Sequence, residues 1–216
     1  MAVADGMGGA PYGGEASRLA LAALESFMER HRQPELLTEA VAEANRAVYR
    51  ESAADRSREG MGTTLTAAMC TGPEGVVAHV GDSRAYLHRP GTLVRVTRDH
   101  SVAGEMVASG SLTDAEAANH PQRHVLTRAV GPFARVSVDR ELFRLGPGTR
   151  LLLCTDGLTA VVEDAALQAV LDREPAGPQA AEALVAAALD RGGPDNITAV
   201  IVEWHPPEEP GEDNGR

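Results

Sequence analysis

Two long helices are predicted near the start of the chain from the spacing of its apolar residues. Apolar side chains recur at helical intervals between Glu15 and Arg30, and again between Glu35 and Ala54. Pro34 suits the first turn of the second helix, because a helix start leaves its N–H groups unpaired in any case. The same spacing predicts helices at 164–173 and 179–190. The chain is therefore expected to carry a helix pair in each half.

Between and after these helices the hydrophobic period shortens to that of β-strands. Short segments rich in β-branched residues are separated by Gly or Pro, which is typical of strands joined by turns. Those between residues 63 and 99 predict an antiparallel meander. Residues 101–131 are polar and mixed, with two short helices at most. The predicted strands are 2–5, 63–71, 75–83, 84–89, 93–99, 136–145, 149–157 and 196–204.

Strands grouped between helix pairs indicate an α+β domain rather than a βαβ repeat. A four-layer α-β-β-α sandwich uses every element, with two antiparallel sheets face to face and a helix pair on each outer side. We expect one domain over residues 1–205. Residues 206–216 are acidic and rich in Pro and Gly, and they are expected to form a disordered tail.

Composition excludes several classes of function. Hydrophobic residues make up 43% of the chain and aromatic residues only 3%, so the core is expected to consist of Ala, Val and Leu. A net charge of −11 argues against a nucleic-acid or anionic-membrane binder. There is no apolar run long enough to span a membrane and no signal peptide. Cys70 and Cys154 lack metal-type spacing and are expected to be reduced, which predicts a cytoplasmic protein.

Three aspartates stand at the ends of apolar strands and are followed by Gly or Asn. They are Asp5 in VADG, Asp156 in LLLCTDG and Asp195 in GGPDNIT. A carboxylate at the buried end of a strand needs solvent, a partner or a cation. A following Gly lets the backbone approach the same ion, and Mg²⁺ and Mn²⁺ prefer oxygen ligands. The pattern indicates a shared cation site, with simple turn roles as the alternative because DG and PDN are common turn sequences.

Other enzyme classes leave no motif in this sequence. GDSRAY does not match the G-x-S-x-G nucleophile pattern, and neither cysteine is followed by the loop of a cysteine-dependent phosphatase. All 20 basic residues are Arg, and a Walker A loop needs Lys. GMGGAPYGG fails the G-x-G-x-x-G pattern because Pro11 takes the last position. These absences exclude nucleotide binding of those two types.

Six segments in a fixed order point to one family. They are VADGMGG, GMGTTLTAAM, VAHVGDSRAYLHRPGTLVRVTRDHS, HVLTRAVG, LLLCTDGL and GGPDNITAVIVE. In this order they resemble the metal-dependent protein serine/threonine phosphatases, the PPM or type 2C family, in their bacterial form. The resemblance runs from Val3 to Glu203, which is nearly the whole chain.

The resemblance implies two Mn²⁺ or Mg²⁺ ions at one end of a β-sandwich, and a weaker third ion. By the motif match, Asp5 bridges both metals and the Gly6 carbonyl binds one, while Asp156 and Asp195 complete the ligands of the other. These three aspartates form the expected catalytic set. Asp99 in TRDHS matches the Asp that holds the third metal together with the Asp156 position. A water shared by two cations ~3.5–4 Å apart loses a proton near neutral pH and attacks phosphorus in line.

The polar residues around these motifs have mainly structural interpretations. His100 is expected to be a hydrogen-bonded loop residue near the metals, with proton donation as the alternative. His120 and His124 are expected on the surface of a segment that covers the site, since Pro121 disfavours a helical metal clamp. Asp82, Ser83 and Arg84 in GDSR are expected to form a hydrogen-bonded turn between strands.

Two departures from the family pattern bear on activity. Met7 occupies a position where many eukaryotic relatives have a His that is proposed to protonate the leaving alcohol, although Met is usual in the bacterial branch. The family pattern also begins with two strands that carry a phosphate-binding Arg and an acidic metal ligand. This sequence lacks them, and Arg18 and Glu15 lie in the following helix. Three explanations fit the missing strands: a wrong recorded start, a truncated enzyme, or a non-catalytic relative. The retained aspartates favour a wrong recorded start.

The sequence therefore predicts a Mn²⁺- or Mg²⁺-dependent protein serine/threonine phosphatase that acts by a metal-activated water. Its expected substrates are phosphoproteins made by Ser/Thr kinases, and it is expected to be monomeric. The alternative is a catalytically impaired or inactive module of the same fold that binds phosphoproteins or a partner kinase. Metal-dependent turnover separates the two.

Overall fold

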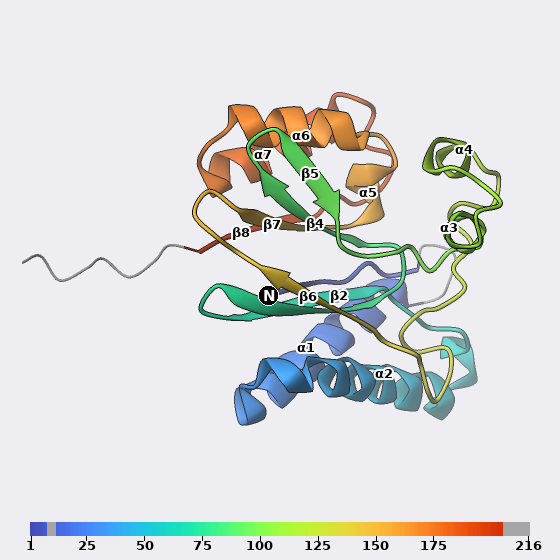
Figure 1. Cartoon of the computed structure of the whole chain (residues 1–216). Coiled ribbons are helices and arrows are strands. Elements are labelled where there is room, and N and C mark those ends of the chain that lie inside the picture. Colours follow the sequence, from blue (N-terminus) through green and yellow to red (C-terminus); the bar gives the residue numbers. More distant parts are fainter. Residues whose placement is uncertain (8–11, 205–216) are drawn as a thin grey trace, which may run out of the picture.

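The structure is a computed structural model of the chain, and it describes residues 1–7 and 12–204. Two four-stranded antiparallel sheets lie face to face (Figure 1). The strands are β1 (Ala2–Val3), β2 (Leu65–Thr71), β3 (Glu74–Val80), β4 (Arg84–Arg89), β5 (Thr92–Arg95), β6 (Asp139–Arg144), β7 (Arg150–Cys154) and β8 (Ala199–Glu203). The first sheet has the order β1-β2-β3-β6, and the second has the order β5-β4-β7-β8.

Helices cover the outer face of each sheet. The first sheet lies against α1 (Gly13–His31) and α2 (Leu37–Ala54), and the second lies against α6 (Asp164–Arg173) and α7 (Gly177–Leu189) (Figure 1). The predicted α-β-β-α sandwich is therefore confirmed. The remaining helices are η1 (Pro34–Leu36), η2 (Arg56–Arg58), α3 (Val102–Ala108), α4 (Asp114–Ala118) and α5 (Asp156–Thr159). Helices α3 and α4 lie beyond one end of the sandwich rather than on a sheet face (Figure 1).

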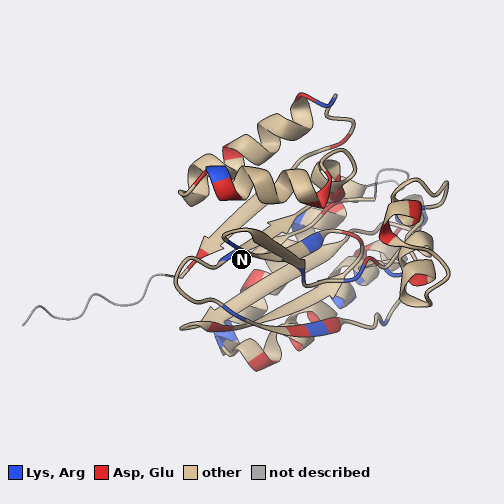
Figure 2. Cartoon of the chain, turned by 45° about the horizontal axis from the view of Figure 1, so that its top comes forward, with Lys and Arg blue, Asp and Glu red and all other residues tan. Residues whose placement is uncertain are grey.

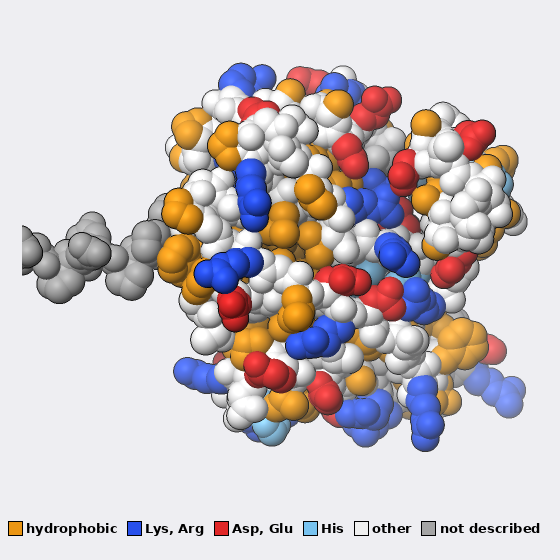
Figure 3. All heavy atoms as spheres, in the orientation of Figure 1, with side chains coloured by type: hydrophobic (Ala, Val, Ile, Leu, Met, Phe, Trp, Pro, Cys, Tyr) orange, Lys and Arg blue, Asp and Glu red, His pale blue; other side chains and the backbone are white. Residues whose placement is uncertain are grey.

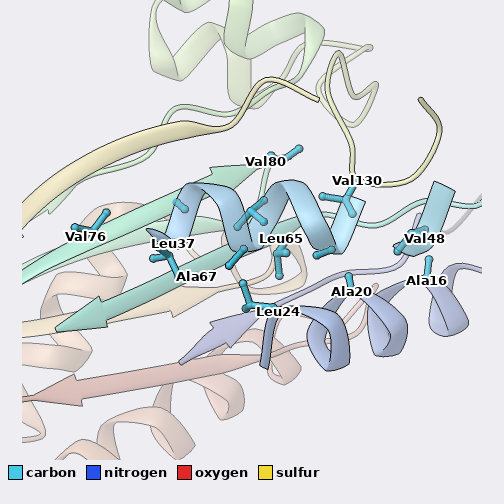
Figure 4. Close-up of a cluster of buried hydrophobic side chains, with 14 of the residues drawn as sticks. Ala16, Ala20, Leu24, Leu37, Val48, Leu65, Ala67, Val76, Val80 and Val130 are labelled. Atoms are coloured by element: carbon cyan, nitrogen blue, oxygen red, sulfur yellow. The ribbon is translucent and has the colours of Figure 1, made fainter. Parts of the chain in front are cut away.

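Three apolar clusters separate the four layers. One lies between α1, α2 and the first sheet and includes Ala20, Leu24, Val48 and Leu65 (Figure 4). A second, around Leu151 and Leu153, fills the space between the sheets, and a third lies between the second sheet and α6 and α7. The clusters consist mainly of Ala, Val and Leu, as the composition predicts. Alternation along β7 explains the division, because successive side chains point to opposite faces of a strand.

The predicted meander divides between the two sheets. β2 pairs with β3 and β4 pairs with β5, but β3 and β4 do not pair with each other. The chain crosses from one sheet to the other at Gly81, whose φ of +113° is accessible to glycine and strained for other residues. The expectation of one continuous meander was therefore wrong at this point. Four short strands in a row do not reveal by themselves which sheet each joins.

The structure also bears on the expectations for the cysteines, for membrane helices and for surface charge. Cys154 is buried and Cys70 is half-buried, and both are free thiols. Within residues 1–7 and 12–204, no helix combines the length and the apolarity that a membrane crossing requires. Acidic and basic side chains are interspersed over the face shown in Figure 3, which therefore offers no continuous basic surface. The predicted tail at 206–216 lies outside the described residues.

Candidate functional site

Four aspartates lie at strand ends that meet at one end of the sandwich. Asp5 follows β1, Asp82 follows β3, Asp156 follows β7, and Asp195 precedes β8. β1 pairs with β2 and β2 with β3, both antiparallel, so the ends of β1 and β3 lie at the same edge. β7 and β8 are likewise antiparallel, which brings the end of one beside the start of the other. Acidic and basic residues gather at this end, beside α3 and α4 (Figure 2).

Asp5 is the most perturbed member of the predicted catalytic set. Burial, which has the largest effect, and the neighbouring carboxylates of Asp156 and Asp195 together raise the pKa of its carboxyl to about 7. Its Oδ2 atom is buried and has no hydrogen-bond partner. The carboxylates of Asp156 and Asp195 are thus near enough to Asp5 to influence its protonation, while their role as metal ligands stays a prediction. A buried carboxylate oxygen without a donor, among like charges, is an environment that a cation stabilises.

Two glycines let these loops approach one another. A Cβ on Gly6 would lie 2.3 Å from the backbone of Gly13, and a Cβ on Gly157 would lie 2.2 Å from the carbonyl oxygen of Asn196. The second contact holds the Asp156 loop against the Asp195 loop. Thr155 strengthens it, because its hydroxyl accepts a hydrogen bond from the N–H of Thr198 at 3.0 Å. Gly6 after Asp5 and Gly157 after Asp156 therefore serve backbone contact, in addition to the metal contact expected of the Gly6 carbonyl.

Asp99, the expected ligand of a third metal, is engaged by two arginines. Arg84 donates to both of its oxygens, at 3.0 Å from Nε to Oδ1 and 2.7 Å from Nη2 to Oδ2, and Arg95 Nη2 lies 2.9 Å from Oδ1. Burial alone would raise the pKa of Asp99, but these ion pairs outweigh it and the pKa lies below its usual value. The carboxylate of Asp99 is therefore already neutralised by protein groups.

Asp82 also lies near these carboxylates. Burial, followed by the charges of Asp156 and Asp99, raises its pKa to about 8. The sequence interpretation assigned Asp82 to a structural turn, and no local signal distinguishes a turn aspartate from one that faces a site. The role expected of Asp99 at a third metal stays a prediction, and Asp82 is a further carboxylate whose pKa responds to Asp156 and Asp99.

His100 has the structural role expected of it. Its Nδ1 accepts a hydrogen bond from the N–H of Gly81 at 3.1 Å, so its Nε2 carries the proton and donates to Asp139 at 3.1 Å. Its ring lies 4.6 Å from that of the buried His79. His79 Nε2 donates to the carbonyl of Arg98 at 3.0 Å. Both imidazoles are occupied within the fold, so neither is placed to protonate a leaving group.

His124 is the histidine that reaches the site. It lies on the segment after α4, its side chain is half exposed, and its Nδ1 is 3.6 Å from Oδ2 of Asp156. His120 instead accepts a hydrogen bond from the N–H of Gln122 and stays in the local turn. The prediction that this segment covers the site is therefore supported, but the sequence did not single out His124. Its contact joins residues 32 positions apart, which no local spacing reveals.

The oxygen chemistry of the site fits a hard divalent cation. The carboxylate of Asp156 acts electrostatically on Asp5, whose Oδ2 atom is buried and unpartnered. Among the described residues, however, no three Asp, Glu, His or Cys side chains already form a set that could hold a metal ion. Main-chain carbonyls and water supply part of the coordination shell of Mg²⁺ and Mn²⁺ in proteins. Two carboxylates can therefore serve as the charged ligands of such a site.

Comparison with known proteins agrees with this geometry. The profile of the family described as protein phosphatase 2C matches residues 1–195. The chain is 34% identical over 208 residues to the serine/threonine phosphatase Stp of Listeria welshimeri, covering 93% of this chain and 82% of the relative. It is 37% identical over 206 residues to PstP of Mycobacterium tuberculosis, covering 94% of this chain and 40% of that longer protein.

A solved structure shows the same fold. The serine/threonine phosphatase Stp1 from Staphylococcus aureus superposes with a TM-score of 0.89 at 32% identity, covering 95% of this chain and 83% of the other. The fold, the sequence similarity and the carboxylate cluster thus point to the same family. The chain belongs to the protein phosphatase 2C family of bacterial serine/threonine phosphatases.

Proposed function

We propose that this chain hydrolyses phosphoserine and phosphothreonine in proteins with a water activated by Mn²⁺ or Mg²⁺. The observation that carries the proposal is the buried, unpartnered Oδ2 of Asp5 beside Asp156, where the charge of Asp195 also acts. Two manganese ions are present in a PstP catalytic-domain structure that is 35% identical to this chain, with a TM-score of 0.79. That relative supports manganese as the first cation to test here.

Each residue of the site has a proposed task. The carboxylates of Asp5, Asp156 and Asp195 and the carbonyl of Gly6 would hold two ions, and Asp99 with Asp156 would hold a weaker third ion, near Asp82. When bound, the ions lower the pKa of a shared water and neutralise charge on the phosphoryl oxygens. The chain's own contribution is to fix these oxygens at the strand ends and to keep them partly buried.

The groups around the cluster shape access to it. Met7 follows Gly6 and cannot donate a proton, so the leaving alcohol must be protonated by water or by another side chain. His124 places an imidazole beside Asp156 from the segment that covers the site. We expect residues 101–125 to influence which phosphoproteins are cleaved, because they border the cluster at its open side.

The wider setting of the enzyme follows from the same proposal. We expect a single catalytic domain over residues 1–205 that acts as a monomer in the cytoplasm on products of Ser/Thr kinases. The absence of a membrane-crossing helix among the described residues is compatible with this. A size measurement in solution tests the monomeric state directly.

The first experiment measures hydrolysis of p-nitrophenyl phosphate and of a phosphothreonine peptide by the 216-residue chain. Turnover is expected with Mn²⁺ and not with chelator. Loss of an outer hydrogen-bond partner of a metal ligand typically costs ~10–100-fold in affinity or activity. Asp156→Asn removes a proposed ligand itself and should therefore reduce kcat/KM by more than that. Asp190→Asn, at the exposed end of α7, is the matched control and should leave turnover unchanged. Folded protein without Mn²⁺-dependent turnover would favour the alternative, an inactive phosphatase-fold module.

A further inference from the structure

Two buried hydroxyls join the loops that carry Asp5 and Asp82. Thr64 is 3% exposed and Ser83 is fully buried. The Oγ1 atom of Thr64 accepts a hydrogen bond from the N–H of Asp5 at 3.0 Å, and it lies 2.8 Å from Oγ of Ser83. Ser83 directly follows Asp82 in the chain. A chain of two hydroxyls therefore runs from the backbone of one carboxylate residue to the neighbour of the other.

Both polar groups of the Asp5 backbone, its N–H and its carbonyl, form hydrogen bonds. Its N–H donates to the Thr64 hydroxyl, and its carbonyl accepts from the N–H of Thr64 at 2.8 Å. The hydroxyl of Thr63 also donates to the carbonyl of Asp5 at 2.8 Å. Because only two torsions separate the backbone of an aspartate from its carboxylate, holding this peptide restricts the positions that the carboxylate can reach.

The turn that carries Asp82 is packed directly on Thr64. A Cβ on Gly81 would lie 2.6 Å from Cβ of Thr64, so this turn and the threonine are in van der Waals contact. The turn thus meets Thr64 twice, through the hydroxyl of Ser83 and through the packed backbone of Gly81. A shift of Thr64 would move the loops of Asp5 and Asp82 together.

A purely structural explanation is that any buried threonine needs a hydrogen-bond partner. The described part of the fold also contains Thr38, whose hydroxyl is buried at the start of α2 without a partner. The fold therefore tolerates a buried threonine hydroxyl that makes no hydrogen bond. In contrast, the partners of Thr64 are the two loops of the proposed metal site, which suggests a role in that site.

We propose that Thr64, assisted by Ser83, is a positioning residue that sets the placement of Asp5 relative to Asp82 and thereby the affinity of the site for divalent cations. This inference rests on the metal site of the proposed function. Outer partners that orient metal ligands influence metal affinity because they hold the ligand in its binding geometry before the ion arrives.

The test is calorimetric titration of the purified chain with MnCl₂, for the wild type and for three variants. Thr64→Val keeps the shape of the side chain but removes the hydroxyl, and it should weaken Mn²⁺ binding by about 10–100-fold. Thr64→Ser retains the hydroxyl and should restore binding to near the wild-type value. Thr38→Val removes a buried hydroxyl that has no partner, and it should bind Mn²⁺ like the wild type.

Enzyme kinetics and a double mutant separate positioning from general damage. In Thr64→Val the Mn²⁺ concentration for half-maximal turnover should rise in the same proportion as the dissociation constant, while kcat at saturating Mn²⁺ falls less. Ser83→Ala should have a smaller effect alone, and its effect should not add to that of Thr64→Val because the two hydroxyls act as one unit. If Thr64→Val does not fold, Ser83→Ala and Thr64→Ser carry the test.

The possible results are distinct. Wild-type Mn²⁺ affinity in folded Thr64→Val, or in folded Ser83→Ala where Thr64→Val is lost, overturns the positioning role and leaves the proposed function intact. Equal weakening by Thr38→Val also overturns it, since that result would indicate a non-specific effect. If the wild type itself does not bind Mn²⁺, and Asp5→Asn makes no difference, the proposed metal site fails and the inference fails with it.

Discussion

At the scale of single residues, the structure separates two aspartates that the sequence makes look alike. Asp82 and Asp99 both lie in loops beside β4 and β5, and both are mostly buried. Asp99 is paired with Arg84 and Arg95, whereas the charges of Asp156 and of Asp99 itself raise the pKa of Asp82. The charge of Asp99 is therefore compensated by two guanidinium groups, while Asp82 lies among like charges.

The two aspartates should differ in their effect on stability. Asp99→Asn leaves the largely buried guanidinium of Arg84 without its carboxylate and should lower the free energy of unfolding by about 3 kcal/mol. Asp82→Asn should lower it by less than about 1 kcal/mol, because a carboxyl with a pKa of about 8 is already mostly protonated at pH 7. Urea denaturation of both variants measures this difference, and Asp82→Asn should instead weaken Mn²⁺-dependent turnover. An equal loss of stability in the two variants would contradict the assignment.

At the scale of elements, the connection between β3 and β4 determines the architecture. It carries the chain from one sheet to the other, and it also presents Asp82 to the site. The connection turns at Gly81 with φ +113°, in contact with Thr64. By contrast, the hairpin between β4 and β5 turns at Gly91 with φ +75° in open space. The two glycines share a positive φ but differ in what surrounds them.

This contrast predicts different responses to the same substitution. Gly91→Ala meets only backbone strain and should lower the free energy of unfolding by about 1–2 kcal/mol. Gly81→Ala adds a clash with Thr64 to the strain and should lower it by about 3 kcal/mol or more. Denaturation curves of both variants at pH 7 give the comparison. Similar losses for the two would show that the contact with Thr64 relaxes without difficulty.

At the scale of the whole molecule, a buried imidazole makes the fold sensitive to acid. Burial and repulsion from His100, against smaller opposite effects of the Arg98 carbonyl, Asp99 and Asp139, lower the pKa of His79 to about 3. His79 is therefore neutral in the folded protein at pH 5, whereas in the unfolded chain it has an ordinary pKa near 6.5 and takes up a proton. The stability that the neutral imidazole of His79 gives the fold is fully present above pH 6.5. It is lost progressively as the pH falls toward 3.

His79→Gln removes this titration and should flatten the dependence of stability on pH. Between pH 7.5 and pH 5 the wild type should lose about 2 kcal/mol more unfolding free energy than the variant, from this linkage alone. The other ionisable groups are shared by both proteins and cancel in the difference. Thermal or urea unfolding across this pH range checks the prediction. Parallel pH profiles for the two proteins would show that His79 does not govern acid sensitivity.

The sequence by itself determined most elements and the general nature of the site. Helical spacing places a helix at 164–173, as the structure has it, and predicts α2 apart from the turn at its start, where Pro34 begins a 3-10 helix. Strand-end aspartates followed by Gly or Asn led to the prediction of Asp5, Asp156 and Asp195 as site residues. These features are local, because helical and strand periods, turns and short motifs are each set by neighbouring residues.

Only the tertiary structure decided how these parts combine. It alone shows that β3 and β4 belong to different sheets, that Arg84 neutralises Asp99, and that His124 reaches Asp156. It also shows Thr64 bonded to Asp5 across 59 positions of the chain. Such contacts join segments distant in sequence, and their geometry depends on how whole layers pack. That packing is a property of the complete fold, so no local pattern in a single sequence contains it.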